Sequence, residues 1–403
     1  MTQTKKIILI IPHMIGGGAE RVASLLMNEF SRSGYETSVV LTADRAQDVV
    51  RRDLDEGSEL VLLKEKMPPE PALRKLLYGV ILRVIAQIAC NLFELFWLPV
   101  PAVFAKASLL VQYRREISWL RNELAASPET AVIAFLQPAV PIALLAARGL
   151  PNKVIFSERG NPRRLMKKRY GRKFIEKYYP RADAAVFQTQ DARNVYPESV
   201  AKKGVVIPNP LKSGLPEPHD GERTKRIVSF CRISPEKNLA MLVRAFARLL
   251  EQRPGHTLAI YGDAANADGE RCKAELISLI DSLGISGSVS LLPSTPDVHS
   301  LIVRDAMYVN SSDSEGLSNA MLEAMAIGLP CICTDCPVGG ARATVISGEN
   351  GILIPTGDED ALFDAMMTLA DDAGLCKKLS RRAAEIRESL SLDAIAARWM
   401  ELL

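Results

Sequence analysis

Short apolar runs alternate with longer amphipathic segments along most of this 403-residue chain, and this alternation is the feature that most constrains its fold. Residues 7–11, Ile-Ile-Leu-Ile-Ile, precede a glycine turn at 16–18 and a segment at 19–33 with apolar residues on one helical face. A buried parallel strand followed by a turn and a helix is the opening unit of a doubly wound α/β fold. The other elements predicted in this half are strands at 37–41, 59–63, 131–135, 153–157 and 184–188 and a helix at 141–148.

The alternation restarts after an irregular segment with prolines and glycines at residues 208–223. We therefore predict an α/β protein with two Rossmann-like domains, residues 1–206 and 207–390. A final helix at 391–403 has an apolar stripe that includes Trp399, and we expect it to pack back across the first domain. The elements predicted in the second domain are strands at 226–231, 257–261, 289–292, 306–309, 330–334 and 352–354 and helices at 239–251, 269–283, 319–327 and 360–370.

Charge and cysteine content limit the class of protein. The formal charge is +3, so no field over the whole molecule favours nucleic acid. Seven cysteines, an odd number in apolar contexts, indicate a reducing compartment. Cys331, Cys333 and Cys336 have no second pair of ligands nearby, so we expect core thiols and no zinc site. The start of the chain is too short for a secretory signal, and we expect a cytoplasmic protein.

The segment 67–124 does not fit the alternation. Between Tyr78 and Ala105 it is apolar, and its only charged residues are Arg83 and Glu94. Polar residues recur there at helical spacing, on one stripe of an otherwise apolar helix. We predict a long apolar helical insertion that lies in a membrane interface or covers a hydrophobic groove, and a helix buried in the protein fits equally well. The stripe argues against a membrane-spanning helix.

The stretch 311–323 places two carboxylates, Glu315 and Glu323, around a Gly-Leu-Ser-Asn turn. A predicted strand ends just before this turn, and Ser318 and Asn319 are placed to cap the helix that follows. The first amides and the dipole of that helix favour an anion between the two acids. A sugar nucleotide offers a pyrophosphate between two hydroxyl-bearing sugars. The stretch therefore predicts a sugar-nucleotide site.

Other candidate residues follow the first strand of each domain. Arg232 and Lys237 lie at the sheet edge where open α/β folds bind ligands, and two cations there are able to stabilise a pyrophosphate leaving group. Solvated loop charges would show the same spacing. Glycines 16–18 let a phosphate or an acceptor approach the backbone. The turn is not the dinucleotide-binding fingerprint, because Arg21 stands where that motif has a glycine. A tight turn that binds no ligand fits the sequence as well. Among the four histidines, only His13 is placed for a cleft.

Ten cations crowd between residues 159 and 181, with Tyr170, Tyr178 and Tyr179 between them. Basic and aromatic residues together suggest nucleic acid. Because the apolar segment 67–124 lies in the same domain, an anionic membrane surface or a pyrophosphate-bearing acceptor explains the run better, and a solvated helix face remains an alternative. We predict that His13, Arg159 and Arg163 contact the acceptor.

Further motifs occur in a fixed order along the chain. They are Pro12-His13 with the glycine turn and Glu20, Val206-Ile-Pro-Asn-Pro210, Arg232 with Glu236-Lys-Asn238, Ile260-Tyr-Gly-Asp263, the Glu315–Glu323 stretch and Gly348-Glu-Asn-Gly-Ile-Leu-Ile354. Together they resemble glycosyltransferase family 4, retaining nucleotide-sugar transferases of the GT-B fold, in which two Rossmann-like domains face each other across a cleft. The resemblance covers nearly the whole second half and the first half in outline.

The resemblance implies roles for these residues. Arg232, Lys237 and Glu315 would form the catalytic set that holds the diphosphate and the sugar, and Glu323 would bind the ribose hydroxyls. The family needs no essential metal, and the leaving phosphate oxygen is thought to help remove the acceptor proton. The other donor-binding residues that the resemblance implies are Gly17, Gly18, Gly316, Leu317, Ser318, Asn319, Leu292 and Pro293.

Many members carry a histidine where this chain has Arg159, in a Ser-Glu-Arg sequence that resembles a subgroup of bacterial polysaccharide and lipid-linked oligosaccharide transferases. We therefore expect a retaining hexosyltransferase that uses a nucleotide-diphosphate sugar and a polyprenyl-pyrophosphate-linked or other lipid-linked glycan acceptor in envelope polysaccharide synthesis. It would be peripheral on the cytoplasmic face of the inner membrane, without nucleic acid. A non-catalytic GT-B subunit and a nucleotide-sugar 2-epimerase are the alternatives.

Overall fold

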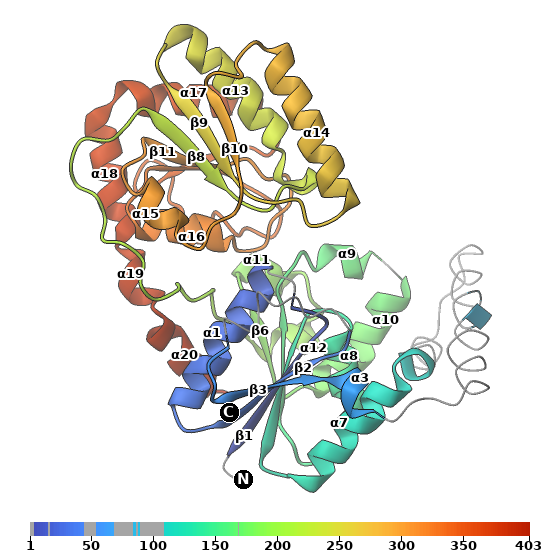
Figure 1. Cartoon of the computed structure of the whole chain (residues 1–403). Helices are drawn as coiled ribbons and strands as arrows, with labels where there is room; N and C mark the ends of the chain where they lie inside the picture. The colour runs from blue at the N-terminus through green and yellow to red at the C-terminus, as the bar shows by residue number, and fades with distance from the viewer. Residues whose placement is uncertain are drawn as a thin grey trace. The chain divides into compact units, whose positions relative to one another are not determined.

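The computed structural model describes residues 4–14, 17–43, 54–67, 84–85, 88, 109–167 and 169–403. The chain forms two compact units, Met1–Pro210 with Ile395–Leu403 and Leu211–Ala394 (Figure 1). Each unit contains one fully parallel sheet, which is the α/β architecture that the alternating sequence pattern predicted.

The first unit contains a seven-stranded sheet in the order β3-β2-β1-β4-β5-β6-β7. Strand β1 lies near its centre because residues 6–11 pair with β2 on one side and with β4 on the other. Apolar residues on both faces of β1 and β4 are buried, which explains their continuous apolar composition. The strands are β1 (Lys6–Ile11), β2 (Glu36–Leu41), β3 (Ser58–Leu62), β4 (Thr130–Phe135), β5 (Val154–Glu158), β6 (Ala184–Phe187) and β7 (Gly204–Val206).

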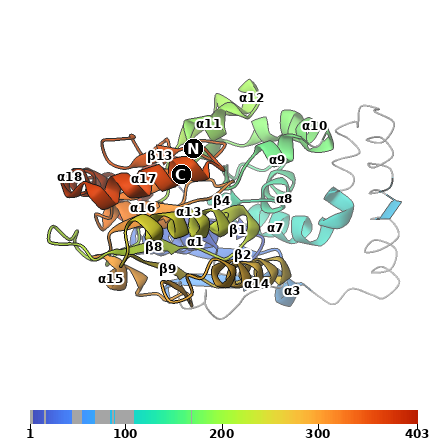
Figure 2. The same ribbon diagram turned by 90° about the horizontal axis from the view of Figure 1, so that it is seen from above.

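Helices cover this first sheet. Helix α1 packs against β1 and β2, and α7 lies beside α8 (Figure 2). Strand β7 was not expected, and it extends the sheet past β6 before the irregular segment begins. The main helices of the unit are α1 (Gly18–Arg32), α7 (Arg114–Ala126), α8 (Ala139–Ala146), α10 (Arg169–Tyr178) and α11 (Gln190–Asn194), with α3 (Leu63–Lys66), α9 (Arg163–Met166), η2 (Tyr179–Arg181) and α12 (Glu198–Ala201) as short turns.

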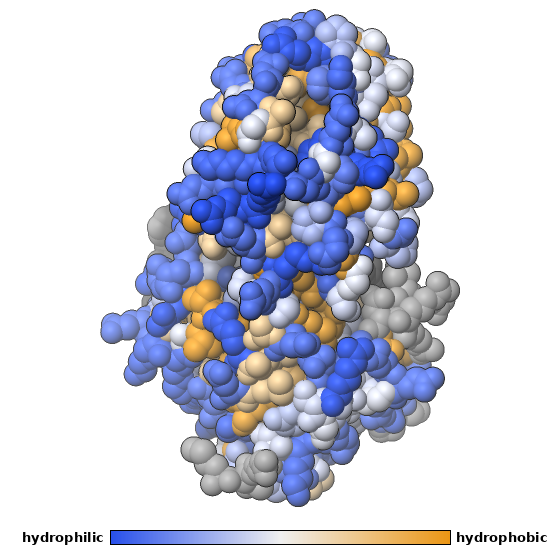
Figure 3. All heavy atoms as spheres, turned by 90° about the vertical axis from the view of Figure 1, so that its left-hand side faces the viewer, coloured by the Kyte–Doolittle hydropathy of each residue, from blue (hydrophilic) through white to orange (hydrophobic). Residues whose placement is uncertain are grey.

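The second unit contains a six-stranded sheet in the order β10-β9-β8-β11-β12-β13. Helix α13 packs against both α17 and α14 (Figure 1), and its apolar face enters the core between these helices and the sheet. The side of the unit that carries α18 is mostly hydrophilic (Figure 3). The strands are β8 (Arg226–Phe230), β9 (Thr257–Tyr261), β10 (Val289–Leu292), β11 (Met307–Asn310), β12 (Cys331–Thr334) and β13 (Ile352–Ile354).

The helices of the second unit include several that the sequence pattern did not predict, α18 above all. They are η3 (Pro235–Lys237), α13 (Leu239–Gln252), α14 (Ala267–Ser282), α15 (Val298–Ile302), α16 (Asn319–Ala326), α17 (Glu359–Asp371), α18 (Ala373–Ala384) and α19 (Ile386–Ser389). The last helix, α20 (Leu392–Met400), brings Trp399 into the first unit, where its fully buried ring lies 5.7 Å from that of Phe135.

Most of the predicted insertion at residues 67–124 lies outside the described residues. Its last part is corrected by the structure: α7 is a covering helix of the first sheet, with Ile117, Leu120 and Leu124 buried. Arg121 fixes this helix by donating to the carbonyls of Ala146 and Arg148 at 2.9 and 2.8 Å. Across the portion of the chain that the structure describes, helices are too short or too polar to cross a bilayer.

Candidate functional site

The loop after β8 in the second unit is held in a strained turn next to the predicted sugar-nucleotide stretch. Asn238 adopts a left-handed backbone conformation, with φ of 44°, and its side chain accepts from the Met241 amide to cap α13. The same side chain donates to Asp313 at 3.0 Å, and the Asp313 amide donates to the Glu236 carbonyl at 2.9 Å. These bonds fix the loop that carries Lys237 against the loop that carries Glu315.

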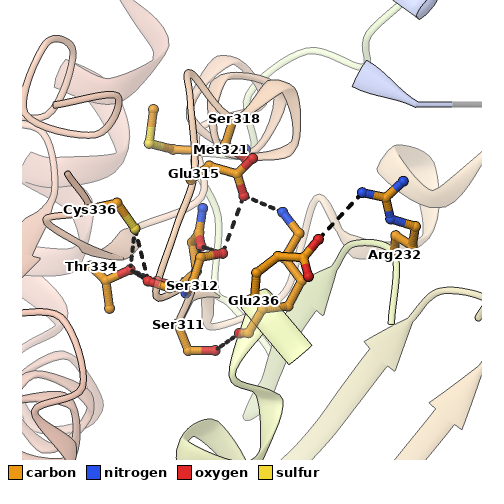
Figure 4. Close-up of polar contacts among 11 residues, drawn as sticks. Arg232, Glu236, Ser311, Ser312, Glu315, Ser318, Met321, Thr334 and Cys336 are labelled. Carbon is orange, nitrogen blue, oxygen red and sulfur yellow. Dashed lines mark hydrogen bonds and ion pairs between the residues drawn. The ribbon is translucent and has the colours of Figure 1, made fainter. Parts of the chain in front are cut away.

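Lys237 and Glu315 form a hydrogen-bonded ion pair at the centre of this arrangement (Figure 4). Both side chains are mostly buried, with 14% and 23% of their surface exposed. Ser312 donates to Glu315 Oε2 at 3.3 Å, and Ser311 donates to the Lys237 carbonyl at 2.9 Å. Burial disfavours the charged form of Lys237, but the Glu315 carboxylate more than offsets this, so the pKa of Lys237 lies above its usual value.

A small recess opens beside this pair at the carboxyl ends of β8 and β11. The pKa of the Cys231 thiol, raised by burial to about 11, keeps this group protonated near neutral pH. Arg232, on the same loop, is half-exposed and lies 3.6 Å from Glu236. The lining of the recess is hydroxyl-rich, and consists of Ser229, Cys231, Lys237, Tyr308, Asn310, Ser311, Ser312 and Ser318.

Helix α16 begins at Asn319, after a short turn that follows Glu315. Ser318 caps it by accepting from the Met321 amide at 3.3 Å, as its sequence position predicts. Gly316, Leu317, Ser318 and Asn319 thus form the turn and the first residues of the helix. Gly340 packs against this turn so closely that a Cβ atom there would lie 1.7 Å from the Gly316 carbonyl oxygen.

Glu323 lies inside α16 and is almost fully buried. Its Oε2 lies 2.8 Å from Nε2 of His299 on α15, which is buried as well. The Phe230 ring, at the end of β8, packs edge-on against this imidazole with centroids 5.4 Å apart. His299 was not among the predicted site residues, because no linear pattern links it to a carboxylate 24 residues later.

Leu292 and Pro293 lie at the carboxyl end of β10, two strands from β8. The Leu292 carbonyl accepts from the Gly262 amide at 2.8 Å, and Ser294, which follows Pro293, is bonded to Asp263. Leu292, Pro293 and the turn from Gly316 to Asn319 therefore follow the carboxyl ends of β10 and β11, on the side of the sheet where parallel α/β folds bind ligands.

In the first unit, His13 and Gly17 both contact Glu20, a residue for which the sequence predicted no role. Glu20 accepts from the Gly17 amide at 2.6 Å through Oε2, and its Oε1 lies 2.8 Å from His13 Nδ1. Glu20 is buried at the third position of α1 and closes the capping box that starts the helix at Gly18. The spacing of a glycine followed by Glu at the third helical position is the sequence feature that points to it.

Arg159 is buried after β5, and this burial lowers the pKa of its guanidinium to about 9. It donates to Ser157 and Asn209 and stacks over Phe135, while its Nε is buried without a hydrogen-bond partner. Arg163, by contrast, is exposed at the start of α9. Neighbouring Glu158 has a pKa raised by burial to about 7.

The basic run after Arg159 lies partly on α10. Tyr178 and Tyr179 are buried and pack on Phe174, so they are not placed to stack on bases. The cysteines predicted as core thiols, Cys331, Cys333 and Cys336, are buried and free. In the described part of the chain, no group of three or more histidine, cysteine or acidic residues is arranged to hold a metal ion.

Comparison with known protein families gives a match within the second unit. Residues 216–386, which lie within it, match the family described as Glycosyl transferases group 1. The matched residues include Arg232, Lys237, Glu315 and Glu323.

The length of the chain that aligns differs among the curated relatives. An N-acetylgalactosamine-N,N'-diacetylbacillosaminyl-diphospho-undecaprenol 4-alpha-N-acetylgalactosaminyltransferase of Campylobacter jejuni is 30% identical over 161 residues, 40% of this chain and 41% of that protein. A GalNAc-alpha-(1->4)-GalNAc-alpha-(1->3)-diNAcBac-PP-undecaprenol alpha-1,4-N-acetyl-D-galactosaminyltransferase of the same species is 26% identical over 290 residues, 70% of this chain and 77% of that protein. For several curated relatives the match spans less than half of the relative's length.

Solved structures match the whole chain. Anabaena Alr3699/HepE in complex with UDP and glucose aligns with a TM-score of 0.73 at 18% identity over 99% of both chains. A sucrose-phosphate synthase from Thermosynechococcus elongatus aligns with a TM-score of 0.74 at 17% identity, covering 99% of this chain and 98% of that one. At these identities the likeness establishes the shared two-domain α/β fold.

Proposed function

We propose that this protein is a retaining glycosyltransferase that moves a hexose from a nucleotide-diphosphate sugar to a lipid-linked glycan acceptor in envelope polysaccharide biosynthesis. The observation that carries the proposal is the Lys237–Glu315 pair beside the capped start of α16, inside a group 1 glycosyltransferase domain.

The chemistry of this pair suits a departing nucleotide diphosphate. Lys237 remains protonated because its pKa is raised, and with Arg232 it supplies positive charge where the leaving phosphate develops negative charge. Glu315 and the turn from Gly316 to Asn319 would contact the sugar and the phosphate, and Glu323 the ribose. These residues act without an essential metal in the proposed reaction.

The acceptor is proposed from the relatives and from the first unit. Two Campylobacter jejuni relatives carry names that specify undecaprenol-diphosphate-linked acceptors. The α10 helix buries Phe174 and Ile175 while Arg172 and Lys173 are exposed, a distribution that suits the anionic surface of a membrane. We propose that the first unit binds the acceptor, with His13, Arg159 and Arg163 near it, on the cytoplasmic face of the membrane.

A donor screen tests the proposal. Purified protein is incubated with a panel of nucleotide-diphosphate sugars and a membrane extract, and nucleotide release and sugar incorporation into lipid are measured. Glu315→Ala and Lys237→Ala should each lower turnover by about 10²-fold or more while the fold persists, since each removes a group that acts on the developing charge. Full turnover in both variants would refute the catalytic assignment.

Two surface substitutions in the same unit serve as matched controls. Glu275→Ala on α14 and Lys225→Ala before β8 remove the same side-chain types at exposed positions, and both should retain full turnover. The anomeric configuration of the isolated product, measured by NMR against that of the donor, tests retention separately. An inverted product would contradict the retaining mechanism and leave the transferase assignment intact.

A further inference from the structure

Arg159 is a buried cation without an acidic partner among the described residues. It is 7% exposed, and its guanidinium donates to the Ser157 hydroxyl at 3.3 Å and to the Asn209 side-chain oxygen. Its third contact is the Phe135 ring, whose centroid lies 4.8 Å from Cζ. All three groups are neutral. Burial lowers the pKa of the guanidinium to about 9, which still leaves it positively charged at neutral pH.

The acid next to Arg159 in the sequence does not supply the missing charge. Glu158 is held by the backbone amides of Arg159 and Gly160, and in the described part of the chain no ion pair joins its carboxyl to a guanidinium. A buried charge that lacks a counter-charge is strongly unfavourable, so buried charges in proteins are normally paired with an opposite charge. Within the ranges that the structure describes, Arg159 has no such partner.

The hydrogen bonds of this guanidinium are incomplete as well. Its two terminal nitrogens donate to Ser157 and Asn209, whereas its Nε is buried without a hydrogen-bond partner in the described chain. A buried donor without an acceptor is costly, and the planar fork of arginine donors fits the oxygens of a phosphate or a carboxylate. What the side chain lacks is therefore an anion with several acceptor oxygens.

The position of Arg159 in the first sheet is one where ligands bind. It follows Glu158, the last residue of β5, and lies over Phe135, the last residue of β4. Strand β4 pairs with β1 on the side opposite to β2, so the strand order reverses between β1 and β4. Open parallel sheets bind ligands outside the carboxyl ends of their strands at such a reversal. An anion bound to Arg159 would lie beside that point.

We propose that Arg159 binds the phosphate oxygens of a diphosphate that joins the acceptor glycan to its lipid. This inference rests on the proposed function and specifies which group of the acceptor the first unit recognises. Of the groups that a lipid-linked glycan offers, a diphosphate carries the most charge and the most acceptor oxygens, so it compensates a buried cation best.

Binding of farnesyl diphosphate, a short polyprenyl diphosphate, to the full chain tests the proposal. Isothermal titration should show binding to the wild type and a Kd that rises by about 10- to 100-fold in Arg159→Met, because charge-assisted hydrogen bonds are lost. Arg159→Lys keeps a cation without the fork and should recover part of the affinity. Arg148→Met, which changes an exposed arginine of the same unit, is the control and should bind as the wild type does.

The melting temperature without ligand separates an anion-binding role from a structural one. Arg159→Met should melt at or above the wild-type temperature, because it replaces an uncompensated buried charge with an apolar side chain. Farnesyl diphosphate should raise the melting temperature of the wild type and not that of the variant. A lower melting temperature in Arg159→Met, together with unchanged affinity for farnesyl diphosphate, would show that Arg159 only supports the fold and would overturn the proposal.

Two other kinds of probe identify the source of the anion. Uridine and guanosine diphosphates should bind Arg159→Met as tightly as they bind the wild type, and methyl glucuronide, a sugar carboxylate, should not displace farnesyl diphosphate. Displacement by the glucuronide, or a nucleoside diphosphate Kd that rises in the variant while the farnesyl diphosphate Kd does not, would overturn the assignment. Absence of sugar transfer by the wild type across the donor panel would refute the proposed function, whereas farnesyl diphosphate binding would still decide whether Arg159 holds a phosphate.

Discussion

His299 Nε2 lies 2.8 Å from Glu323 Oε2, and both side chains are buried in the second unit. Nδ1 of His299 is buried without a hydrogen-bond partner, so the ring's contact with the carboxylate is made through Nε2. The short helix α15 therefore fixes the orientation of an acid on α16, the helix whose first turn forms the candidate donor site.

His299→Leu should weaken donor binding because it removes a hydrogen bond that orients the buried Glu323. Loss of a bond to a buried charged group is worth about 1–3 kcal/mol, or roughly a tenfold to hundredfold rise in the Kd of the nucleotide-diphosphate sugar. His299→Gln, which retains an N–H donor, should recover part of this affinity. Isothermal titration with the donor found in the screen measures both effects.

Ser300→Ala, an exposed change on the same helix, is the control for α15 and should leave the Kd unchanged. Equal affinity in His299→Leu and the wild type, with both proteins folded, would show that Glu323 is oriented without the imidazole or does not contact the donor.

Gly340→Ala should disrupt the turn that contains Gly316. The new Cβ would lie 1.7 Å from the Gly316 carbonyl oxygen and 3.2 Å from the Cα of Leu317, so backbone must move. We expect loss of donor binding and a lower melting temperature of the protein. Gly287→Ala is the matched control, because Gly287 lies in the same unit and has open space around its Cβ position. Unchanged binding in Gly340→Ala would mean that the turn is not part of the donor site.

The central strands were predictable because a strand that is buried on both faces has a continuous run of apolar residues in the sequence. Residues 7–11 and 131–135 are continuous apolar runs, and both are strands flanked by neighbours on each side. Strand β7 was missed because it has three residues and is partly exposed at the edge of its sheet. Ser318 was predicted as a cap because capping depends on a local spacing of three residues.

The contacts that orient the candidate site depend on tertiary packing and were not predictable in the same way. His299 reaches Glu323 only because α15 lies against α16 after a strand and a turn between them. Glu20 was missed for a different reason, since the N-cap of α1 is Gly17, and the usual capping signature begins with a serine or threonine. Arg159 is buried and Arg163 is exposed, and this difference depends on tertiary packing, which the spacing of charged residues in the sequence does not predict.

Asp305 should make the protein less stable as pH rises from about 4 to about 6. Its side chain is fully buried, and this burial raises its pKa to about 6 despite hydrogen bonds from Arg226 and Thr224. Between its unfolded and folded pKa values the folded state holds the extra proton, so raising the pH favours unfolding. The effect should be on the order of 3 kcal/mol, complete above about pH 7.

Thermal unfolding of Asp305→Asn and the wild type between pH 4 and pH 8 isolates this contribution. The wild-type melting temperature should fall relative to that of the variant between pH 4 and pH 6, and the difference should be constant above pH 7. Asp364→Asn, at an exposed position on α17, should follow the wild type throughout. A difference that grows in favour of the wild type as pH rises would contradict the sign.

Trp399→Ala should destabilise the first unit, because it removes a large side chain from the core of that unit. The indole is fully buried against Phe135, and its Nε1 has no hydrogen-bond partner. Truncation leaves a large cavity, which costs about 3–5 kcal/mol. Trp399→Phe keeps most of the ring and removes the unpaired N–H, so its loss should stay below about 1.5 kcal/mol. Hydrogen exchange of the β1 and β4 amides measures both. Equal protection in Trp399→Ala and the wild type would show that α20 does not stabilise this sheet.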